Sequence, residues 1–366
     1  MSRRLRFYFT GVSVSQLRVS AEYQTAEGME TVDLSAAVEW QQPLVTLHAK
    51  FLPAHTIEED TSKKPAHHLR TSPGFYRLRF EGLPPKAKIL SAEIDRGEGW
   101  LPVESVAELE FGTFGSLYAP VAAQPLLEPM VWSGAVAFEG HQTLEQDLII
   151  QPGTTVRLAP GATLVLKGRL LAEGTLERPI RFLSQQADQA PWGAIVLMGP
   201  GANGSRLTHC EMAGGSGQKG ALFEYSAMFS VHDVKGVSVK DCLFRDSRVV
   251  DDMVHTVYAD IRFERTRFEN AFADALDLDI SEAVIIDSQF NHSGNDAVDL
   301  MTARAHISGS TFVGNGDKGI SVGENSHLFA VDNCLVGNLI GVESKDRSTA
   351  LLFNQTLKDN EIGLHA

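Results

Sequence analysis

The sequence predicts an all-β chain, with a β-sandwich-like domain over residues 1–125 followed by a parallel β-helix over residues 129–366. Two observations support this fold class. Apolar and polar residues alternate with a period of two in the first part, and the second part repeats itself about every 22 residues. The 32 glycines and 19 phenylalanines, against 4 tryptophans, add a composition rich in turns and strands.

The first part contains four alternating segments, each of which places its apolar groups on one face. This pattern is typical of antiparallel strands with one buried face, and we expect a sandwich of about seven strands. The polar residues 55–74 interrupt the pattern and predict a long surface loop. The alternating segments are Leu5–Phe9, Leu17–Tyr23, Val32–Trp40 and Tyr76–Phe80.

Six similar hexapeptides define the repeat of the second part, and an earlier copy begins at Leu207 with a longer spacing. A period of about 22 residues is too short for a helical-hairpin repeat and fits one coil of a parallel β-helix, whose coils stack ~4.8 Å apart. The last position of each hexapeptide predicts an apolar column in the core. The hexapeptides begin at Val239, Phe263, Ile285, Ile307, Val331 and Leu352, and the column consists of Phe244, Phe268, Phe290, Phe312, Val336 and Leu357.

The sequence predicts where the stack of coils begins and where it ends. The short strands of residues 148–175, broken at Pro-Gly and Gly-Thr, predict the first coils. The sequence stops at Ala366 directly after a coil, without a capping helix, and an open coil end presents unpaired strand edges. We therefore expect either a longer natural chain or an oligomer contact through the C-terminal coil end.

The composition limits the partners and the location of the protein. A formal net charge of −14 disfavours nucleic acid and anionic membranes, because their binding depends on Lys and Arg. No apolar run approaches the ~20 residues that span a bilayer, so no membrane span is expected. The N-terminus is basic but has no apolar segment behind it, unlike a signal peptide. We expect the periplasm or cell surface if an export signal was removed, and the cytoplasm if the chain is complete.

A second set of columns follows from aligning the segments after each hexapeptide. The positions between them are apolar and point inward by the period-two rule, so these polar residues point outward on one face or lie at the turn that leads into it. Acidic residues make up most of the first two columns. The three columns are Asp252, Asp274, Asp296 and Lys318; His255, Asp277, Asp299, Ser321 and Glu343; and Asp279, Met301, Gly323 and Lys345.

Stacked carboxylates ~4.8 Å apart repel one another, by about 1 kcal/mol per pair in water and more at lower dielectric. Three arrangements would offset this repulsion. The aspartates can accept backbone N–H groups at the turns, share Ca²⁺, or pair with Lys318 in the next coil. The candidate calcium ligands are Asp274, Asp277, Asp296 and Asp299, the candidate binding residues beside them are Asp252, Glu343, Lys345, Asp346 and Glu324, and Asp317 is assigned to turn structure.

His255, at the head of a carboxylate column, is a candidate ligand or acid–base group, with a hydrogen-bonded surface histidine as the alternative. The sequence contains no HExxH, no CxxC pair, no Walker loop and no G-x-S-x-G elbow. Residues 214–220, GGSGQKG, lack the GK[ST] ending of a phosphate loop and predict a flexible turn between coils.

The segments PGTTVRLAPGATLVLKGRLLAEGT, DALDLD, GNDAVDL, GDKGISVGENS and GVESKDRS resemble the right-handed parallel β-helix family of the pectin-lyase-like superfamily. The resemblance runs from about Pro129 to Ala366. It is closest to the β-helix domain that accompanies bacterial spore-coat-H-type kinase-like and lamin-tail-like envelope proteins. It implies right-handed coils and a place in the cell envelope.

The same superfamily contains pectate lyases in which aspartates hold Ca²⁺ and a lysine abstracts a proton. By this resemblance, the four aspartates named above would hold Ca²⁺ and Lys318 would be the base. A general base must be neutral at the working pH, whereas neighbouring carboxylates raise the pKa of a lysine. The activity would therefore depend on bound metal.

Two hypotheses of function follow. The first is a cell-envelope or surface-associated protein that binds polysaccharide or a partner protein along its coil face, without need of catalysis. The second is a Ca²⁺-dependent lyase or epimerase that acts on a uronate polysaccharide, with Lys318 as the base. The aspartate columns beside Lys318 are the candidate site on either hypothesis.

Overall fold

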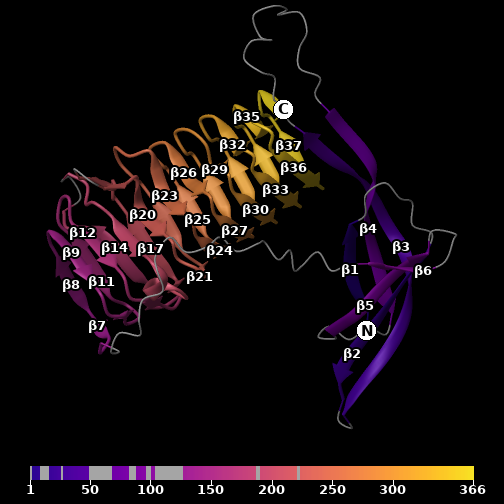
Figure 1. Ribbon diagram of the computed structural model, residues 1–366, viewed down its shortest axis with the longest axis horizontal. Helices are drawn as coiled ribbons and strands as arrows, with labels where there is room; N and C mark the ends of the chain where they lie inside the picture. Colours follow the sequence, from indigo (N-terminus) through magenta and orange to yellow (C-terminus); the bar gives the residue numbers. More distant parts are fainter. Residues whose placement is uncertain are drawn as a thin grey trace, which may run out of the picture. The chain divides into compact units, whose positions relative to one another are not determined.

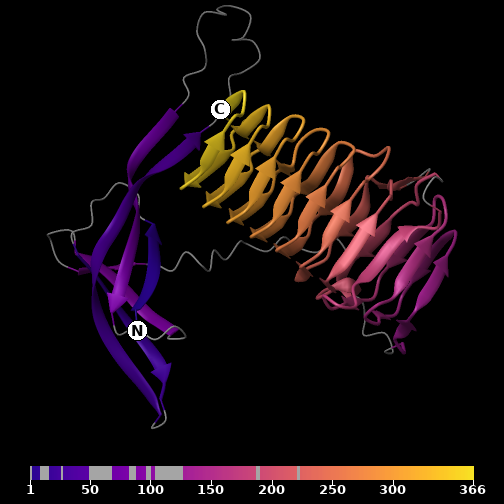
Figure 2. The ribbon, with the colours of Figure 1, turned by 180° about the vertical axis from the view of Figure 1, so that it is seen from behind.

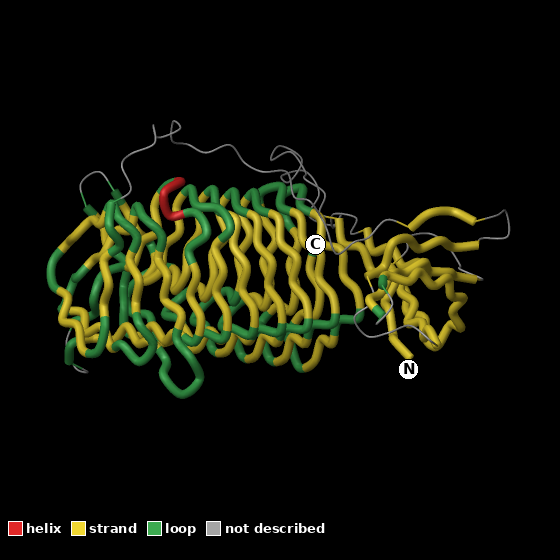
Figure 3. The backbone as a smooth tube through the Cα atoms, turned by 90° about the horizontal axis from the view of Figure 1, so that it is seen from below, coloured by secondary structure: helices red, strands yellow, loops and turns green. Residues whose placement is uncertain are grey.

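The computed structural model describes residues 2–8, 16–25, 28–48, 68–81, 88–95, 100–103, 127–186, 190–220 and 223–366. These residues form strands and turns with one short helical turn, η3 (Pro200–Ala202), shown red in Figure 3. The predicted all-β class is thereby confirmed. The chain divides into two compact units: Met1–Thr46, Leu69–Phe111 and Leu351–Asn354 form one, and Leu47–His68, Gly112–Ala350 and Gln355–Ala366 form the other. The predicted domain limit at residue 125 lies outside the described residues.

The described strands of the N-terminal region are antiparallel, as the alternation predicts. β1 pairs with β4, β2 with β3 and β5, and β5 with β6. Whether two sheets face each other as a sandwich stays a prediction. β4 begins inside the segment predicted as a loop, and residues 55–67 of that segment lie outside the described residues. The strands are β1 (Ser2–Tyr8), β2 (Gln16–Gln24), β3 (Met29–His48), β4 (His68–Glu81), β5 (Lys88–Asp95) and β6 (Trp100–Val103).

The second unit is a parallel β-solenoid whose coils stack side by side along the chain, from magenta to yellow in Figures 1 and 2. Each coil contributes one strand to each of three sheets, and two of these sheets have ten strands. The sheet that carries the candidate site is called the β9–β38 sheet. It contains β9 (His141–Leu144), β12 (Thr163–Leu166), β15 (Ile195–Met198), β20 (Ala227–His232), β23 (Asp252–Val257), β26 (Asp274–Asp279), β29 (Val298–Met301), β32 (Lys318–Gly323), β35 (Ile340–Ser344) and β38 (Ile362–His365).

The other two sheets complete the coils and enclose the core. One contains β8 (Ala135–Phe138), β11 (Thr155–Leu158), β14 (Ile180–Ser184), β17 (Cys210–Ala213), β22 (Leu243–Arg245), β25 (Arg267–Glu269), β28 (Gln289–Asn291), β31 (Thr311–Val313), β34 (Cys334–Val336) and β37 (Thr356–Lys358). The other contains β7 (Met130–Trp132), β10 (Leu148–Ile150), β13 (Leu170–Glu173), β16 (Arg206–Thr208), β21 (Val237–Lys240), β24 (Asp260–Glu264), β27 (Glu282–Ile286), β30 (Arg304–Ser308) and β33 (His327–Val331), and β36 (Thr349–Phe353) follows in the last coil.

A ladder of buried phenylalanines fills the core, as the repeat predicts. The ring centroids of Phe244 and Phe268 lie 5.4 Å apart, those of Phe268 and Phe290 4.5 Å, and those of Phe290 and Phe312 4.9 Å. All four side chains are fully buried. Coils that repeat in register place identical rings one strand spacing apart, where they stack.

The prediction that Val336 continues this column is wrong. Leu335 lies opposite Phe312 in the β31–β34 pair, and Leu335 is buried whereas Val336 is half-buried. The cause is Asn333, whose side-chain oxygen accepts the Ser310 N–H at 2.9 Å. The asparagine takes the place that Ser310 has in the preceding coil, where the Ser310 hydroxyl accepts the Ser288 N–H, and this shifts the coil by one residue.

The turns between the strands explain the abundance of aspartate and asparagine. Asp241, Asn270, Asp287 and Asp332 have φ angles of 53°, 56°, 49° and 56°. Their short polar side chains tolerate this left-handed conformation better than most residues do. No helix within the described ranges is long and apolar enough to cross a membrane.

Candidate functional site

The outward residues of the β9–β38 sheet form the candidate site. Strand pairing places His255 opposite Asp277, Asp277 opposite Asp299, Asp299 opposite Ser321, and Ser321 opposite Glu343. We call these five residues the outer column; their predicted alignment is confirmed. The residues that alternate with them are fully buried in the core: Leu276, Leu278, Val298, Leu300, Ile320 and Val322.

The outer column is recessed although it points away from the core. The side chains of His255 and Asp277 are only 12% and 14% exposed, and Ser321 is 0% exposed. Asp277 Oδ1, Asp299 Oδ1 and Ser321 Oγ are buried and have no hydrogen-bond partner among the described residues. Buried polar atoms in native proteins are nearly always paired. Three successive coils therefore present unmet hydrogen-bonding capacity on one line.

In the first column, at the start of the strands, backbone N–H groups offset the repulsion between the stacked aspartates. Asp274 Oδ1 accepts the Asp296 N–H at 2.7 Å and the Asn295 side-chain amide at 2.7 Å. Asp296 Oδ1 accepts the Lys318 N–H at 2.9 Å. Two of the four predicted calcium ligands thus already serve the turns.

Lys318 lies among carboxylates at the end of this column. Its Nζ is 3.4 Å from Asp296 Oδ1, 4.0 Å from Glu343 Oε2, and in contact with Asp317. Burial alone would lower the pKa of Lys318, but the carboxylates of Asp317, Asp296 and Glu343 outweigh it and raise that pKa. The geometry therefore favours a charged ammonium that neutralises the column. Asp317, which sequence reasoning assigned to the turn, is a direct partner of this lysine.

Burial makes several of these acids weak. It raises the pKa of Asp252 to about 7, of Asp277 to about 9, of Asp296 to about 7 and of Asp274 to about 6. For Asp277, the neighbouring carboxylates of Asp252, Asp279 and Asp299 add to the effect of burial. At neutral pH the face therefore retains protons, which a cation can displace.

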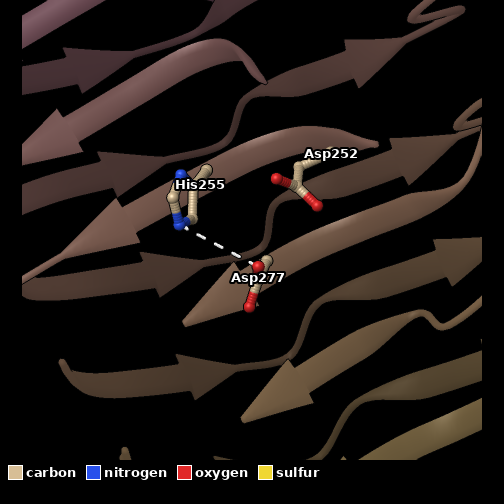
Figure 4. Close-up of side chains that lie close together, drawn as sticks. All are labelled: Asp252, His255 and Asp277. Carbon is tan, nitrogen blue, oxygen red and sulfur yellow. Dashed lines mark ion pairs between the residues drawn. The ribbon is translucent and has the colours of Figure 1, made fainter. Parts of the chain in front are cut away.

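Within the described part of the chain, one group of three side chains has the spacing of metal ligands. Ligand atoms of Asp252, His255 and Asp277 all lie within 4.8 Å of one another. In Figure 4, Asp252 and His255 project from β23 toward Asp277 of β26. The Asp277 Oδ1 without a partner fits a role as ligand, and imidazole with carboxylates suits a divalent transition metal such as Zn²⁺.

Asp277 is the one member of this group that also belongs to the predicted calcium set. Ca²⁺ takes six to eight oxygens, and oxygens of Asp274 and Asp296 are engaged in local bonds. A calcium site built from Asp274, Asp277, Asp296 and Asp299 stays a prediction.

His255 is held on both sides of its ring. Nδ1 lies 2.8 Å from Ser226 Oγ, and Nε2 lies 3.2 Å from Asp279 Oδ2 and 3.9 Å from Asp277 Oδ2. A hydrogen bond from Ser226 to Nδ1 fixes the orientation of the His255 ring, so that Nε2 points toward the aspartates. The predicted roles of His255 as ligand or acid–base group stay predictions, and the ring is hydrogen-bonded as the alternative interpretation expects.

The other end of the outer column carries mixed charge. Glu343 accepts from His365 Nδ1 at 2.8 Å and pairs with Lys345 Nζ at 3.4 Å. Burial, together with Asp299 and Asp346, raises the pKa of Glu324. The predicted binding residues Glu343, Lys345, Glu324 and Asp346 therefore lie at this end, whereas Asp252 lies at the other.

Sequence reasoning missed Ser226, Tyr225 and His232. Tyr225 and Ser226 belong to an insertion between β17 and β20 that includes the hairpin β18 (Gln218–Lys219) and β19 (Glu224–Tyr225), and His232 is the last residue of β20. The predicted flexible turn is thus partly a hairpin strand. One signal was present: the hexapeptide copies at Leu207 and Val239 begin 32 residues apart (239 − 207) instead of about 22.

A family model described as "Right handed beta helix region" matches residues 227–366. This region is a right-handed β-helix. The predicted handedness is confirmed for these residues, and the resemblance to the pectin-lyase-like superfamily stays a prediction. The closeness to envelope proteins of the spore-coat-H and lamin-tail types stays a prediction. No curated protein matches the chain significantly by sequence.

Several solved structures match the chain at low sequence identity. An alginate lyase from Paenibacillus sp. str. FPU-7 is 14% identical, with a TM-score of 0.32 over 59% of this chain and 91% of that one. The Dettilon tailspike protein is 8% identical, with a TM-score of 0.40 over 60% of this chain and about half (52%) of that one. The periplasmic alginate epimerase AlgG is 9% identical, with a TM-score of 0.27 over 59% and 78%. These values carry no information about the activity of this β-helix.

Proposed function

We propose that the β-helix binds polysaccharide along the outer column, and that binding is its basic activity. The observation that carries the proposal is the line of outward polar side chains that His255, Asp277 and Asp299 form on successive coils. A glycan offers hydroxyl groups that repeat along its chain, and coils repeat every ~4.8 Å along the face. Hydroxyl groups along the glycan can form hydrogen bonds with the accessible atoms of these side chains, which are partly exposed.

The charge of the face limits which glycans fit. The acidic residues of the first two columns would repel a uronate polymer unless a cation lies between them. A neutral or amino-sugar polymer needs no such ion. We accordingly propose that uronate binding, where it occurs, depends on Ca²⁺ or another divalent cation at the acidic end.

The test is a binding panel of linear β-glucan, chitosan, alginate and polygalacturonate, each measured with EDTA and with Ca²⁺. Asp277→Asn and Asp299→Asn should each weaken binding by about fivefold, the value of roughly one hydrogen bond. Asp260→Asn is the matched control, because Asp260 is exposed on a different sheet. Binding of no polymer, or equal losses in all three variants, would remove the proposal.

The lyase or epimerase activity remains a second candidate, with Lys318 as base. The carboxylates around Lys318 oppose a role as base, because they raise the pKa of Lys318 and favour its protonated form. The assay is the ultraviolet absorbance of unsaturated uronates from alginate or polygalacturonate with Ca²⁺, compared between the native protein and Lys318→Ala. Turnover that is unchanged in the variant would exclude Lys318 as base.

A place in the cell envelope, with an envelope protein as a further partner, is also proposed. It is supported by the resemblance to β-helix domains of envelope proteins. Fractionation of cells that produce the native protein, followed by detection with an antibody, would test it: recovery in the cytosol alone would contradict it.

A further inference from the structure

The insertion between β17 and β20 covers part of the outer face of the β9–β38 sheet. Tyr225 of the hairpin is buried against Val165, Ala194 and Val196, with Met198 beside them. Val165 of β12 pairs with Val196 of β15, and their chain neighbours are the core leucines and isoleucine of these strands. Because successive side chains of a strand alternate between faces, Tyr225 lies on the outer face.

Several contacts anchor this cover. Gln218 is hydrogen-bonded to Thr163 Oγ1 of β12, and the Phe223 ring lies 5.6 Å from the His141 ring of β9. At the base of the insertion, Trp192 Nε1 donates to the Ala213 carbonyl at 2.8 Å. Contacts with several coils hold the hairpin in place.

The outer face changes character where the cover ends. Strand register continues the outer column backward from His255 to Ser230, Val196 and Val165. The two valines beneath Tyr225 are apolar, Ser230 is fully buried, and the polar run begins at His255. The polar part of the face is therefore bounded on this side by the hairpin.

At this boundary, side chains of the insertion and of β20 pack directly against His255. Ser226, next to the hairpin, lies 2.8 Å from His255 Nδ1. The ring of His232 lies 5.7 Å from that of Tyr225 and 5.8 Å from that of His255. At the opposite end of the column, the side chains of Lys345 and His365 are 40% and 51% exposed. The outer column is closed at His255, whereas side chains beside its other end are exposed.

We propose that the face binds the end of a glycan chain, with the terminal sugar beside Ser226, His255 and Asp277 and the rest of the chain running toward β38. This inference rests on the proposed function of the outer column. A polymer that continued past His255 would meet Tyr225 and His232. A chain that stops there needs no such space, and its terminal hydroxyl groups face the polar groups of His255 and Asp277.

The test uses the native protein and the polymer of the panel that binds best, either intact or cut by partial hydrolysis to about one half and one quarter of its length. Binding to chain ends predicts that the protein bound at saturation, per mass of polymer, doubles each time the chain length is halved. Binding along the chain predicts no increase. An unchanged capacity would overturn the inference and leave the proposed function standing, whereas no binding at all would remove both.

Two variants locate the closed end independently. Ser226→Ala, beside His255, should weaken the binding of short fragments and of long chains by about fivefold each. Lys345→Ala, at the other end, should weaken long chains alone, because a short fragment bound at the closed end does not reach β38. Loss of short-fragment binding in Lys345→Ala, with none in Ser226→Ala, would place the terminal sugar at the wrong end and overturn the inference.

Discussion

At the scale of single residues, the site combines weak acids with one ammonium group. Asp296 is buried, and its charge is offset by both the N–H and the side chain of Lys318. Removing one partner of a buried ion pair leaves the other charge uncompensated, which costs more than the pair contributes as a whole. The contacts of Lys318 therefore predict a structural role that can be measured without any substrate.

Lys318→Ala is expected to lower the free energy of unfolding by about 3 kcal/mol at pH 8. Lys345→Ala, whose ammonium is 40% exposed, should cost less than about 1 kcal/mol. Urea denaturation of both variants measures the difference. Equal losses would show that the burial of Lys318 among carboxylates has no energetic weight.

The raised pKa values of Asp252, Asp277 and Asp296 predict a stability that falls as the pH rises. Each folded-state pKa, at about 7, 9 and 7, lies above the ordinary value of 3.8. Between these limits the folded state binds more protons than the unfolded state, so the free energy of unfolding decreases with pH. The stability present at pH 4 is lost progressively up to about pH 9.

Thermal melts from pH 5 to pH 9 should show this loss, which we expect to exceed about 2 kcal/mol. Asp277→Asn carries no titrating group at this position and should flatten the curve above pH 7. A native protein whose stability rises over this range, or a variant with the same slope, would contradict the prediction.

The ligand spacing of Asp252, His255 and Asp277 predicts that divalent metal stabilises the fold. Zn²⁺ should raise the melting temperature more at pH 8 than at pH 6, because metal binding displaces protons from these groups. The effect should vanish in Asp277→Asn and His255→Ala and persist in Asp260→Asn. A Ca²⁺ effect that depends instead on Asp274 and Asp296 would support the four-aspartate site predicted from the sequence.

At the scale of elements, the coils are held by columns of like residues. Phe290 stacks on Phe268 on one side and on Phe312 on the other, with interplanar angles of 4° and 2°. Each ring therefore contributes to two interfaces between coils. We therefore expect the core to be sensitive to substitution in the middle of the ladder.

Phe290→Ala should lower the free energy of unfolding by about 3–5 kcal/mol, the usual cost of emptying a buried aromatic position. Phe353→Ala, in the last coil, offers a comparison at another buried phenylalanine. Urea denaturation followed by circular dichroism measures both. A cost below about 1 kcal/mol at Phe290 would mean that neighbouring coils close over the gap.

Sequence repeats made the coil interior and the outer column predictable, because both depend on local alternation and on register. Phe268 and Asp277 were placed correctly by counting residues. The slip at Val336 was not predictable in this way, because it arises from the hydrogen bond between Asn333 and the preceding coil. Contacts made by an insertion, such as Ser226 with His255, depend on where a loop folds back and leave no periodic trace.

At the scale of the whole molecule, the sequence distinguishes the two parts of the chain by the period of their hydrophobic pattern. The β-helix follows from its period, whereas the arrangement of the antiparallel strands does not, since alternation alone does not tell which strands pair. The proposed oligomer contact at the C-terminal coil end stays a prediction, and light scattering of the native protein in solution would test it. A strictly monomeric mass would exclude that contact.

Because the outer column is closed at His255, the number of coils beyond it sets the length of glycan chain that the face can contact. Every coil added beyond β38 would lengthen the face by one strand spacing, ~4.8 Å, without disturbing the groups around His255. Duplication or loss of a single 22-residue segment would thus change how many sugars the face binds, counted from the terminal sugar at His255. Length selectivity could then evolve in whole coils while the chemistry at the origin stays constant.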